Sequence, residues 1–202
     1  MAYFLIAHKL TMGDEGGYAN NPSDHGGETY KGIARKFWGS WPGWLVVDKY
    51  KKGVAAQPPY GSAAYASWVK ALNLVLAQDP VLQQSVLNFY QENFWQANHL
   101  NEILDQNVAN WLYNHIVNGG ARGAMWLQAA AGVAPDGAIG SKSIAAINAV
   151  DPVALLDRAM DNAVAYRLAK VRAEPDQAQF LRSWLARDGV SESKIRLVMA
   201  TV

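Results

Sequence analysis

The sequence contains no cysteine and comparatively few charged residues. A chain without cysteine has no disulfide scaffold, no thiolate metal site and no cysteine nucleophile. Charged residues make up 17% of the 202 positions, below the roughly one quarter that is usual in globular domains. The 18 Lys and Arg against 17 Asp and Glu leave a formal net charge of +1. This balance gives no basic surface of the kind that binds duplex nucleic acid, so nucleic acid is not an expected partner.

The sequence also has no long hydrophobic run. No stretch approaches the roughly 18 apolar residues of a transmembrane helix, so stable membrane insertion is not expected. The apolar run 2–7 is too short for the core of a signal peptide and has no basic leader, which predicts synthesis in the cytoplasm without a Sec signal. P-loop, zincin and nucleophile-elbow motifs are absent and the four histidines are scattered, so neither a metal nor a cofactor is expected.

Apolar and aromatic residues are abundant. Half of the chain is hydrophobic, which is enough to bury a core, and eight Trp and nine Tyr are many. A weakly charged, aromatic-rich surface suits a neutral or extended polymer better than a polyanion, because aromatic rings pack on the apolar faces of sugars. Trp111, Trp126 and Trp184 lie on predicted helix faces and are expected in the core, whereas Trp41 and Trp44 fit a core or a groove equally well.

Helical periodicity dominates from about residue 62 and predicts a mainly α protein. Asp79-Pro80 and Asp151-Pro152 each pair an N-cap residue with a proline at the first helical position. The second of these helices is expected to end near Glu174-Pro175, because proline disfavours helix in the residue before it. Its buried face is predicted to comprise Leu156, Met160, Val164, Leu168 and Val171.

The first 60 residues are rich in glycine and proline. A helix is expected over about residues 2–13 and another near 32–38, followed by an irregular segment over 39–61. No run of residues alternates between apolar and polar for long enough to predict a strand.

Two carboxylates in this N-terminal region are candidates for acid catalysis. Glu15 follows the first predicted helix and precedes two glycines, where a polymer could approach the backbone closely. Asp24 follows after a turn-rich segment, and a pair of carboxylates across a cleft is the minimal apparatus for hydrolysing a glycosidic bond. The alternatives are an exposed acidic helix end for Glu15 and an Asx-turn for Asp24.

Two neighbouring residues add to this constellation. The hydroxyl of Thr29 could hold a water molecule together with Asp24, although Thr29 also suits a helix N-cap or a strand. Glu28 is a competing acid that spacing alone does not exclude.

Residues 15–18 and 22–33 resemble the opening signature of glycoside hydrolase family 108. These are lysozyme-like N-acetylmuramidases of phages and bacteria, some of them described as secretion activators. Members read Glu-Gly-Gly-Tyr and then Pro-x-Asp-x-Gly-Gly-x-Thr-x-x-Gly-Ile, and this chain matches each of those positions. Residues 118–128 and 132–140 resemble segments of the peptidoglycan-binding domain that ends such proteins. The resemblance implies a lysozyme-like catalytic domain over residues 1–104 and a helical peptidoglycan-binding module over 105–202, packed as one unit.

The resemblance also implies an activity and a site. Glu15 would protonate the β-1,4 glycosidic oxygen between N-acetylmuramic acid and N-acetylglucosamine in peptidoglycan glycan strands, and Asp24 with Thr29 would position water or stabilise the sugar cation. Tyr18, Tyr30 and Trp95 neighbour the signature and are candidates for stacking on sugars. Asn118 could hydrogen-bond a sugar amide, or merely end its helix beside two glycines.

Two other activities remain open from the sequence. A lytic transglycosylase would need the glutamate but not Asp24, and a non-catalytic wall-binding secretion activator would need neither. The resemblance, together with the missing signal-peptide pattern, suggests an endolysin-like route in which a holin releases the protein to the periplasm or cell wall.

Overall fold

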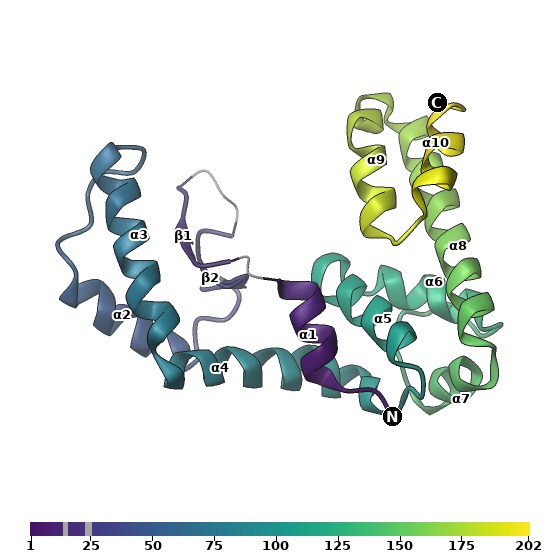
Figure 1. Cartoon of the computed structure of the whole chain (residues 1–202), viewed down its shortest axis with the longest axis horizontal. Helices are drawn as coiled ribbons and strands as arrows, with labels where there is room; N and C mark the ends of the chain where they lie inside the picture. The colour runs from purple at the N-terminus through teal and green to yellow at the C-terminus, as the bar shows by residue number, and fades with distance from the viewer. Residues whose placement is uncertain (14–15, 23–25) are drawn as a thin grey trace. The chain divides into compact units, whose positions relative to one another are not determined.

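The computed structural model describes residues 1–13, 16–22 and 26–202. It shows a mainly α protein, as predicted, and also one small sheet (Figure 1). The helices are α1 (Phe4–Met12), α2 (Gly43–Gly53), α3 (Ala63–Gln78), α4 (Pro80–Tyr90), α5 (Gln106–Gly119), α6 (Arg122–Ala130), α7 (Ser141–Ala149), α8 (Pro152–Ala173), α9 (Ala178–Arg187) and α10 (Glu192–Met199). The strands are β1 (Tyr18–Asn20), β2 (Glu28–Tyr30) and β3 (Ile33–Ala34).

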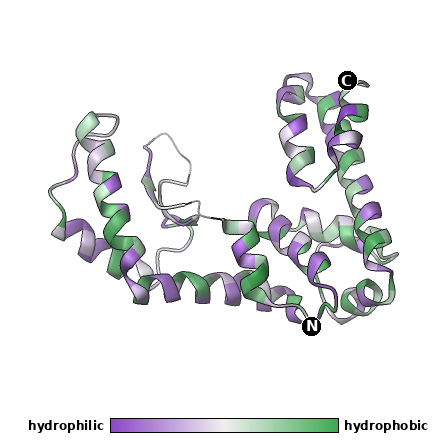
Figure 2. Ribbon diagram, viewed as in Figure 1, coloured by the Kyte–Doolittle hydropathy of each residue, from purple (hydrophilic) through white to green (hydrophobic). Residues whose placement is uncertain are grey.

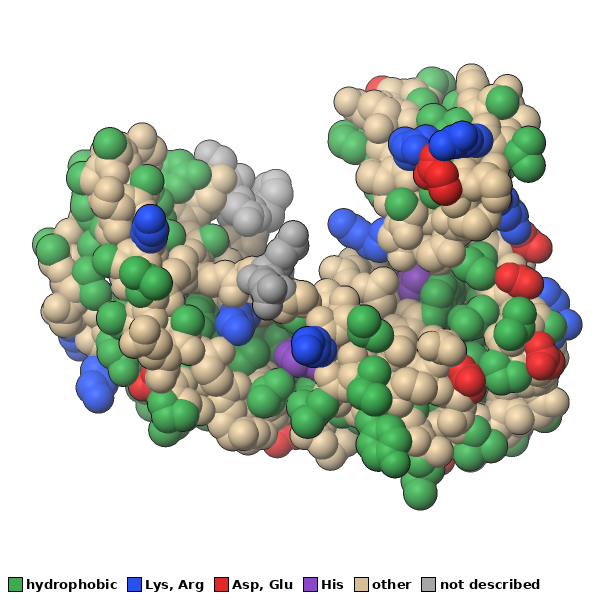
Figure 3. Space-filling model, viewed as in Figure 1, with side chains coloured by type: hydrophobic (Ala, Val, Ile, Leu, Met, Phe, Trp, Pro, Cys, Tyr) green, Lys and Arg blue, Asp and Glu red, His purple; other side chains and the backbone are tan. Residues whose placement is uncertain are grey.

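The chain divides into two compact units, which we describe separately. The hairpin unit comprises residues 12–93, and the helical unit comprises residues 1–11 and 94–202. Figure 2 shows hydrophobic and hydrophilic residues alternating along the helices of both units, as expected of amphipathic helices. On the face shown in Figure 3, charged side chains are sparse and scattered, in keeping with the low charged fraction. In the described part of the chain, no helix is long and apolar enough to cross a membrane.

Helix ends lie where the sequence predicts them. The Asp79 carboxylate accepts the Leu82 N–H at 2.8 Å at the start of α4, and Asp151 accepts the Ala154 N–H at 2.9 Å at the start of α8. Glu174 ends α8 immediately before a proline. These are local interactions within one turn of chain, which is why sequence alone identifies them.

Three predictions for the N-terminal region are wrong. The segment expected to be a helix near 32–38 contains strand β3, and the segment 39–61, expected to be irregular, contains helix α2. Strands are present although none was predicted, because they are only two or three residues long and give no recognisable alternation. Trp44 and Val47 form the short buried face of α2. They are too few to give a clear helical period among so many glycines and prolines.

The hairpin unit is built around the antiparallel sheet β1-β2-β3 and the helices α2, α3 and α4. The register pairs Tyr18 with Tyr30, Ala19 with Thr29, Asn20 with Glu28, Thr29 with Ala34 and Tyr30 with Ile33. The fully buried aliphatic residues Ile33, Leu72, Leu76 and Leu82 come from the sheet, α3 and α4. The two tryptophans left open by the sequence, Trp41 and Trp44, are both in this core.

The helical unit packs α6 against α5 and α8, with α9 and α10 against the end of α8. Gly123 permits the contact between α5 and α6, because a Cβ at this position would lie 2.2 Å from the Cβ of His115. On α8 the buried face includes Val164 and Val171 as predicted, but Leu155 and Ala159 are buried more deeply than the predicted Leu156 and Met160. The remaining core residues of the C-terminal helices are Leu181, Leu185, Val190 and Ile195.

Candidate active site

The signature that carries the predicted catalytic residues coincides with the hairpin β1-β2-β3. Glu15 and Asp24 lie outside the described residues; in sequence, Glu15 comes shortly before β1 and Asp24 between β1 and β2. Thr29 is the central residue of β2, opposite Ala19 on one side and Ala34 on the other, and its side chain is partly buried.

The two glycines of the signature have different structural roles. Gly16 has φ +92°, a left-handed conformation that side-chain-bearing residues rarely adopt. Gly17 makes room for Asn73, since a Cβ at Gly17 would lie 2.3 Å from the Asn73 Oδ1 atom. Asn73 uses this space to accept the main-chain N–H of Tyr18 at 2.5 Å and to donate to the Tyr18 carbonyl at 3.4 Å. The amide of Asn73 therefore holds β1 through main-chain hydrogen bonds.

The tyrosines of the signature are buried within the hairpin unit. The ring of Tyr18 contacts that of Trp68 edge-on at 5.8 Å, and its hydroxyl donates to Glu28 at 2.8 Å. The Tyr30 hydroxyl accepts from the Gln83 side chain at 2.9 Å. Burial raises the pKa of both tyrosines, and the Glu28 carboxylate raises that of Tyr18 further. With their rings 2% and 1% exposed, both residues form part of the framework here, and their contact with sugar stays a prediction.

Glu28, the competing acid, is the centre of a network of charges. One carboxylate oxygen lies 2.5 Å from the Lys51 Nζ and the other 2.8 Å from the Arg35 Nε. Arg35 in turn forms a two-pronged ion pair with Asp48, at 3.1 and 2.7 Å, and its guanidinium lies 4.3 Å from the centre of the Trp44 ring. Both oxygens of Glu28 are thus engaged by cations, so this residue links the hairpin to α2.

Sequence reasoning missed the residues of segment 39–78 that hold the hairpin. Helix α2 supplies Lys51 and Asp48, and α3 supplies Asn73 and Trp68. Tyr65 of α3 also donates its hydroxyl to the Asn20 carbonyl at 2.8 Å. Nothing in the sequence marks these side chains, because they are separated from their partners by many positions and have no motif of their own.

A surface hollow of about 320 Å³ is also present in the hairpin unit. Trp38, Asn88, Glu92 and Asn93 contribute to its lining. Trp38 is 38% exposed and packs edge-on against Phe89 at 4.8 Å. Aromatic and amide groups together are suited to a sugar ring, so Trp38, which clusters in sequence with Trp41 and Trp44, is a further aromatic candidate.

The other two predicted binding residues lie in the helical unit. Trp95 is buried, with its ring edge-on to Phe4 at 5.9 Å and to Tyr113 at 5.8 Å. Asn118 is exposed near the end of α5, where its amide donates to the main chain and side chain of Asn114, both at 2.9 Å. The structure therefore groups Thr29 with Tyr18 and Tyr30, while Asn118 belongs to a different pocket.

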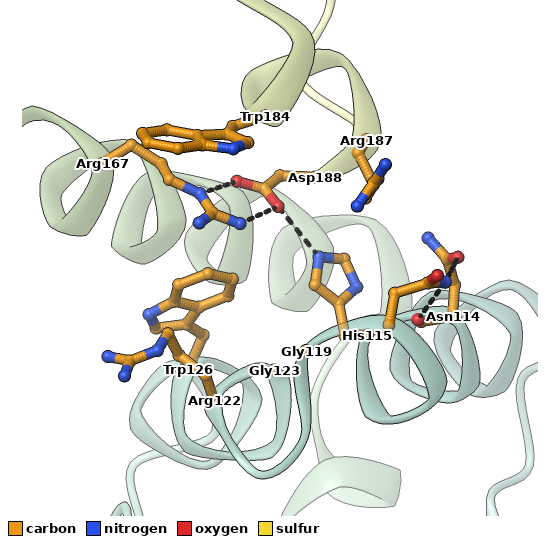
Figure 4. A pocket seen from close by; sticks show the side chains of 11 residues that line it. Asn114, His115, Gly119, Arg122, Gly123, Trp126, Arg167, Trp184, Arg187 and Asp188 are labelled. Carbon is orange, nitrogen blue, oxygen red and sulfur yellow. Dashed lines mark hydrogen bonds and ion pairs between the residues drawn. The ribbon is translucent and has the colours of Figure 1, made fainter. Parts of the chain in front are cut away.

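That pocket has a volume of about 220 Å³ and a buried ion pair in its wall (Figure 4). Asp188, fully buried, receives Arg167 Nε at 3.0 Å and Arg167 Nη2 at 3.1 Å, and lies 3.3 Å from His115 Nε2. Burial acts to raise the pKa of Asp188, but hydrogen bonds from His115 and Arg167 outweigh it and hold that pKa below its usual value. The His115 Nδ1 faces the Trp111 carbonyl at 2.7 Å, so both ring nitrogens of His115 have partners within the helical unit.

Gln128 connects the two segments that resemble the peptidoglycan-binding domain, residues 118–128 and 132–140. The amide nitrogen of buried Gln128 donates to Asp136 at 2.7 Å and to the Ala138 carbonyl at 3.0 Å, while its oxygen accepts the Gly137 N–H at 2.8 Å. These bonds fix the turn between α6 and α7. Gln128 in the segment 118–128 and the Asp136–Gly137 pair in the segment 132–140 are therefore joined directly by hydrogen bonds.

Two family models match consecutive segments of the chain. A family model described as Glycosyl hydrolase 108 matches residues 8–120, and one described as Predicted Peptidoglycan domain matches residues 122–188. The chain belongs to glycosyl hydrolase family 108. SagA from Brucella abortus has a similar structure, with 25% sequence identity, a TM-score of 0.54, and coverage of 98% of this chain and 94% of its own. No curated protein sequence matches. The predicted family and its lysozyme-like, mainly α fold are confirmed.

The Gly17–Asn73 contact predicts a sharp difference between two glycine substitutions. Gly17→Ala is expected to lower the unfolding free energy by about 1–3 kcal/mol, because its methyl would displace the Asn73 amide. Gly53→Ala is the control, since nothing lies within 4 Å of its added Cβ and alanine favours helix. Thermal unfolding of both variants tests this, and an unchanged melting temperature for Gly17→Ala would contradict it.

The buried ion pair predicts a pH-dependent loss of stability in Asp188→Asn. The lowered pKa means that the carboxylate stabilises the fold above its unfolded-state pKa of about 4, and that this stability is lost as pH falls through the lower folded-state value. The variant is expected to lose about 3–5 kcal/mol at pH 7, because Arg167 loses its buried partner.

Urea unfolding at pH 7 and pH 3 measures the effect. The gap between wild type and Asp188→Asn should narrow in acid. Asp161→Asn, which removes an exposed ion pair with Lys194, is the control and should change stability by less than about 1 kcal/mol at either pH. Equal stability of Asp188→Asn and wild type at neutral pH would refute the prediction.

Proposed function

We propose that this peptidoglycan-acting glycosidase cleaves the β-1,4 bond between N-acetylmuramic acid and N-acetylglucosamine. The observation that carries the proposal is the complete family signature, Glu15 to Ile33, lying inside the family 108 match and beside a predicted peptidoglycan domain. We keep the division into a catalytic part, residues 1–104, and a binding part, residues 105–202, as part of this proposal. Release to the periplasm or cell wall, for example through a holin, completes it.

In the proposed mechanism two carboxyl groups act on the glycosidic bond. Glu15 donates a proton to the leaving oxygen, while Asp24 and the Thr29 hydroxyl hold the attacking water or stabilise the oxocarbenium-like transition state. A separation of about 6.5–9.5 Å between the carboxyl groups gives inversion, and about 5 Å gives a covalent intermediate.

The network around Glu28 supports the choice of Glu15 as the acid. Glu28 is the other glutamate of the signature, and Lys51, Arg35 and Tyr18 occupy its two oxygens. A general acid needs a proton to give and a substrate oxygen within reach. Glu28 does not meet the second requirement, because both of its oxygens are engaged by cations and its side chain is 13% exposed.

Substituting each glutamate in turn distinguishes the two. Glu15→Gln is expected to slow the clearance of purified sacculi by at least about 100-fold, the usual effect of losing a general acid, with little change in melting temperature. Glu28→Gln is the matched control: it weakens the ion pairs to Lys51 and Arg35, so it should lower the melting temperature and retain clearance where folded. Clearance by Glu15→Gln at the wild-type rate would refute the assignment.

The digestion products separate hydrolysis from the alternatives. Mass spectrometry of wild-type digests is expected to show reducing N-acetylmuramic acid ends, and Asp24→Asn should produce them far more slowly. Anhydromuramic ends, with an almost silent Asp24→Asn, would identify a lytic transglycosylase instead. Retention on sacculi without any released ends would identify a non-catalytic binding protein.

A further inference from the structure

The pocket in the helical unit holds more positive charge than its own carboxylate neutralises. We propose that it binds a carboxylate of the peptidoglycan stem peptide, so that this part of the chain recognises peptide rather than glycan. The proposal rests on peptidoglycan being the polymer acted on and adds which chemical group of that polymer the pocket takes. Its charged residues come from four places: Arg122 on α6, Arg167 on α8, Arg187 on α9, and Asp188 just after α9 (Figure 4).

The charges do not balance within the pocket. Asp188 is fully engaged, with both of its oxygens held by Arg167 and one also near His115. Arg122 and Arg187 also line the cavity, and neither has a carboxylate within ion-pair distance among the residues that the structure describes. Figure 4 shows these two guanidinium groups on different sides of the pocket, Arg187 near Asp188 and His115 and Arg122 beside Trp126, so each is available to a carboxylate separately. Their planar forks match a carboxylate, with which they form paired, charge-assisted hydrogen bonds.

Aromatic rings hold two of the arginines, Arg122 and Arg167, and give the pocket an apolar side. The guanidinium of Arg167 lies 5.4 Å from the ring centre of Trp126 and 5.2 Å from that of Trp184, so it sits between the two indoles (Figure 4). The guanidinium of Arg122 lies 4.1 Å from the ring of Tyr166. This stacking restricts the arginine side chains before a ligand binds and lowers the entropy lost on binding. Trp126 and Trp184, expected in the core, thus also form a wall for an aliphatic side chain.

The size and the rim of the pocket favour peptide over glycan. About 220 Å³ is below the range typical of sites that enclose a drug-sized ligand, so the cavity suits a terminal residue better than a disaccharide. Asn114 and Asn118 at the rim offer amides for the peptide backbone. Where a stem peptide is attached, the lactyl carboxyl of N-acetylmuramic acid is part of an amide bond, so the glycan there offers only hydroxyl and acetamido groups, whereas the stem peptide carries free carboxylates.

Direct binding of an isolated stem peptide tests the proposal. The probe is the tetrapeptide L-Ala-γ-D-Glu-meso-diaminopimelate-D-Ala with a fluorophore on its N-terminus, titrated with the full chain by fluorescence anisotropy. Arg122→Gln/Arg187→Gln is expected to raise Kd about tenfold or more, the factor expected for losing a charge-assisted hydrogen bond. Lys142→Gln/Arg158→Gln removes the same charge from exposed positions on α7 and α8 that do not line the pocket, and is expected to change Kd less than about twofold.

Competition identifies the group that is bound. Unlabelled tetrapeptide should displace the probe, whereas the same peptide with all its carboxylates amidated, and an N-acetylglucosamine oligomer, which has no carboxylate, should not. Equal affinity of the wild type and the Arg122→Gln/Arg187→Gln variant, or equal displacement by the amidated peptide or the N-acetylglucosamine oligomer, would overturn the proposal. The tetrapeptide contains no glycosidic bond, so the result is independent of turnover. If the protein clears sacculi but does not bind the tetrapeptide, this inference alone is refuted. If the protein binds the tetrapeptide but does not cleave glycan, the proposed hydrolysis alone is refuted.

Discussion

The hairpin of the family signature depends on the ion pairs of Glu28 with Lys51 and Arg35. Short strands of two or three residues cannot hold themselves together in water, so the hairpin needs support from outside its own ladder. Glu28 provides it by joining β2 to α2, while Asn73 fixes the main chain of β1 from α3. The family signature thus has structural roles: Gly17 makes room for Asn73 of α3, the ring of Tyr18 packs against Trp68 of α3, and Gly16 adopts a left-handed backbone conformation.

Sequence reasoning succeeded where the controlling interactions are local. Asp79 and Asp151 cap the starts of their helices by accepting hydrogen bonds from main-chain N–H groups three positions further on. Such a short spacing can be recognised in the sequence alone. Sequence reasoning failed where partners are distant, since Asn73 lies 55 positions from Tyr18 and belongs to a segment with no recognisable motif. The strands were missed for a different reason, because runs of two or three residues are too short to show an alternating pattern.

The pocket of the helical unit shows a different limit. Periodicity marked Trp126 and Trp184 as core residues, and both do pack against neighbours. Periodicity does not say where packed faces separate to leave a cavity between them, and it does not pair Arg167 with Asp188, 21 positions away. Asn118 was predicted as a binding residue and lines this pocket. The arginines and tryptophans that line it with Asn118 belong to no common sequence motif, so the sequence could not predict that they meet.

The order in which the helical unit is assembled follows from its discontinuous sequence. Residues 1–11 pack with residues 94–202, and Phe4 rests its ring against Trp95 and Tyr113. During synthesis α1 leaves the ribosome before the hairpin unit, yet its packing partners emerge only after the whole hairpin unit has been made. Apolar side chains of α1 such as Phe4 therefore lack these partners while the intervening segment has the opportunity to fold. The contacts of Phe4 with Trp95 and Tyr113 thus join two stretches of chain across a segment that can fold before they meet.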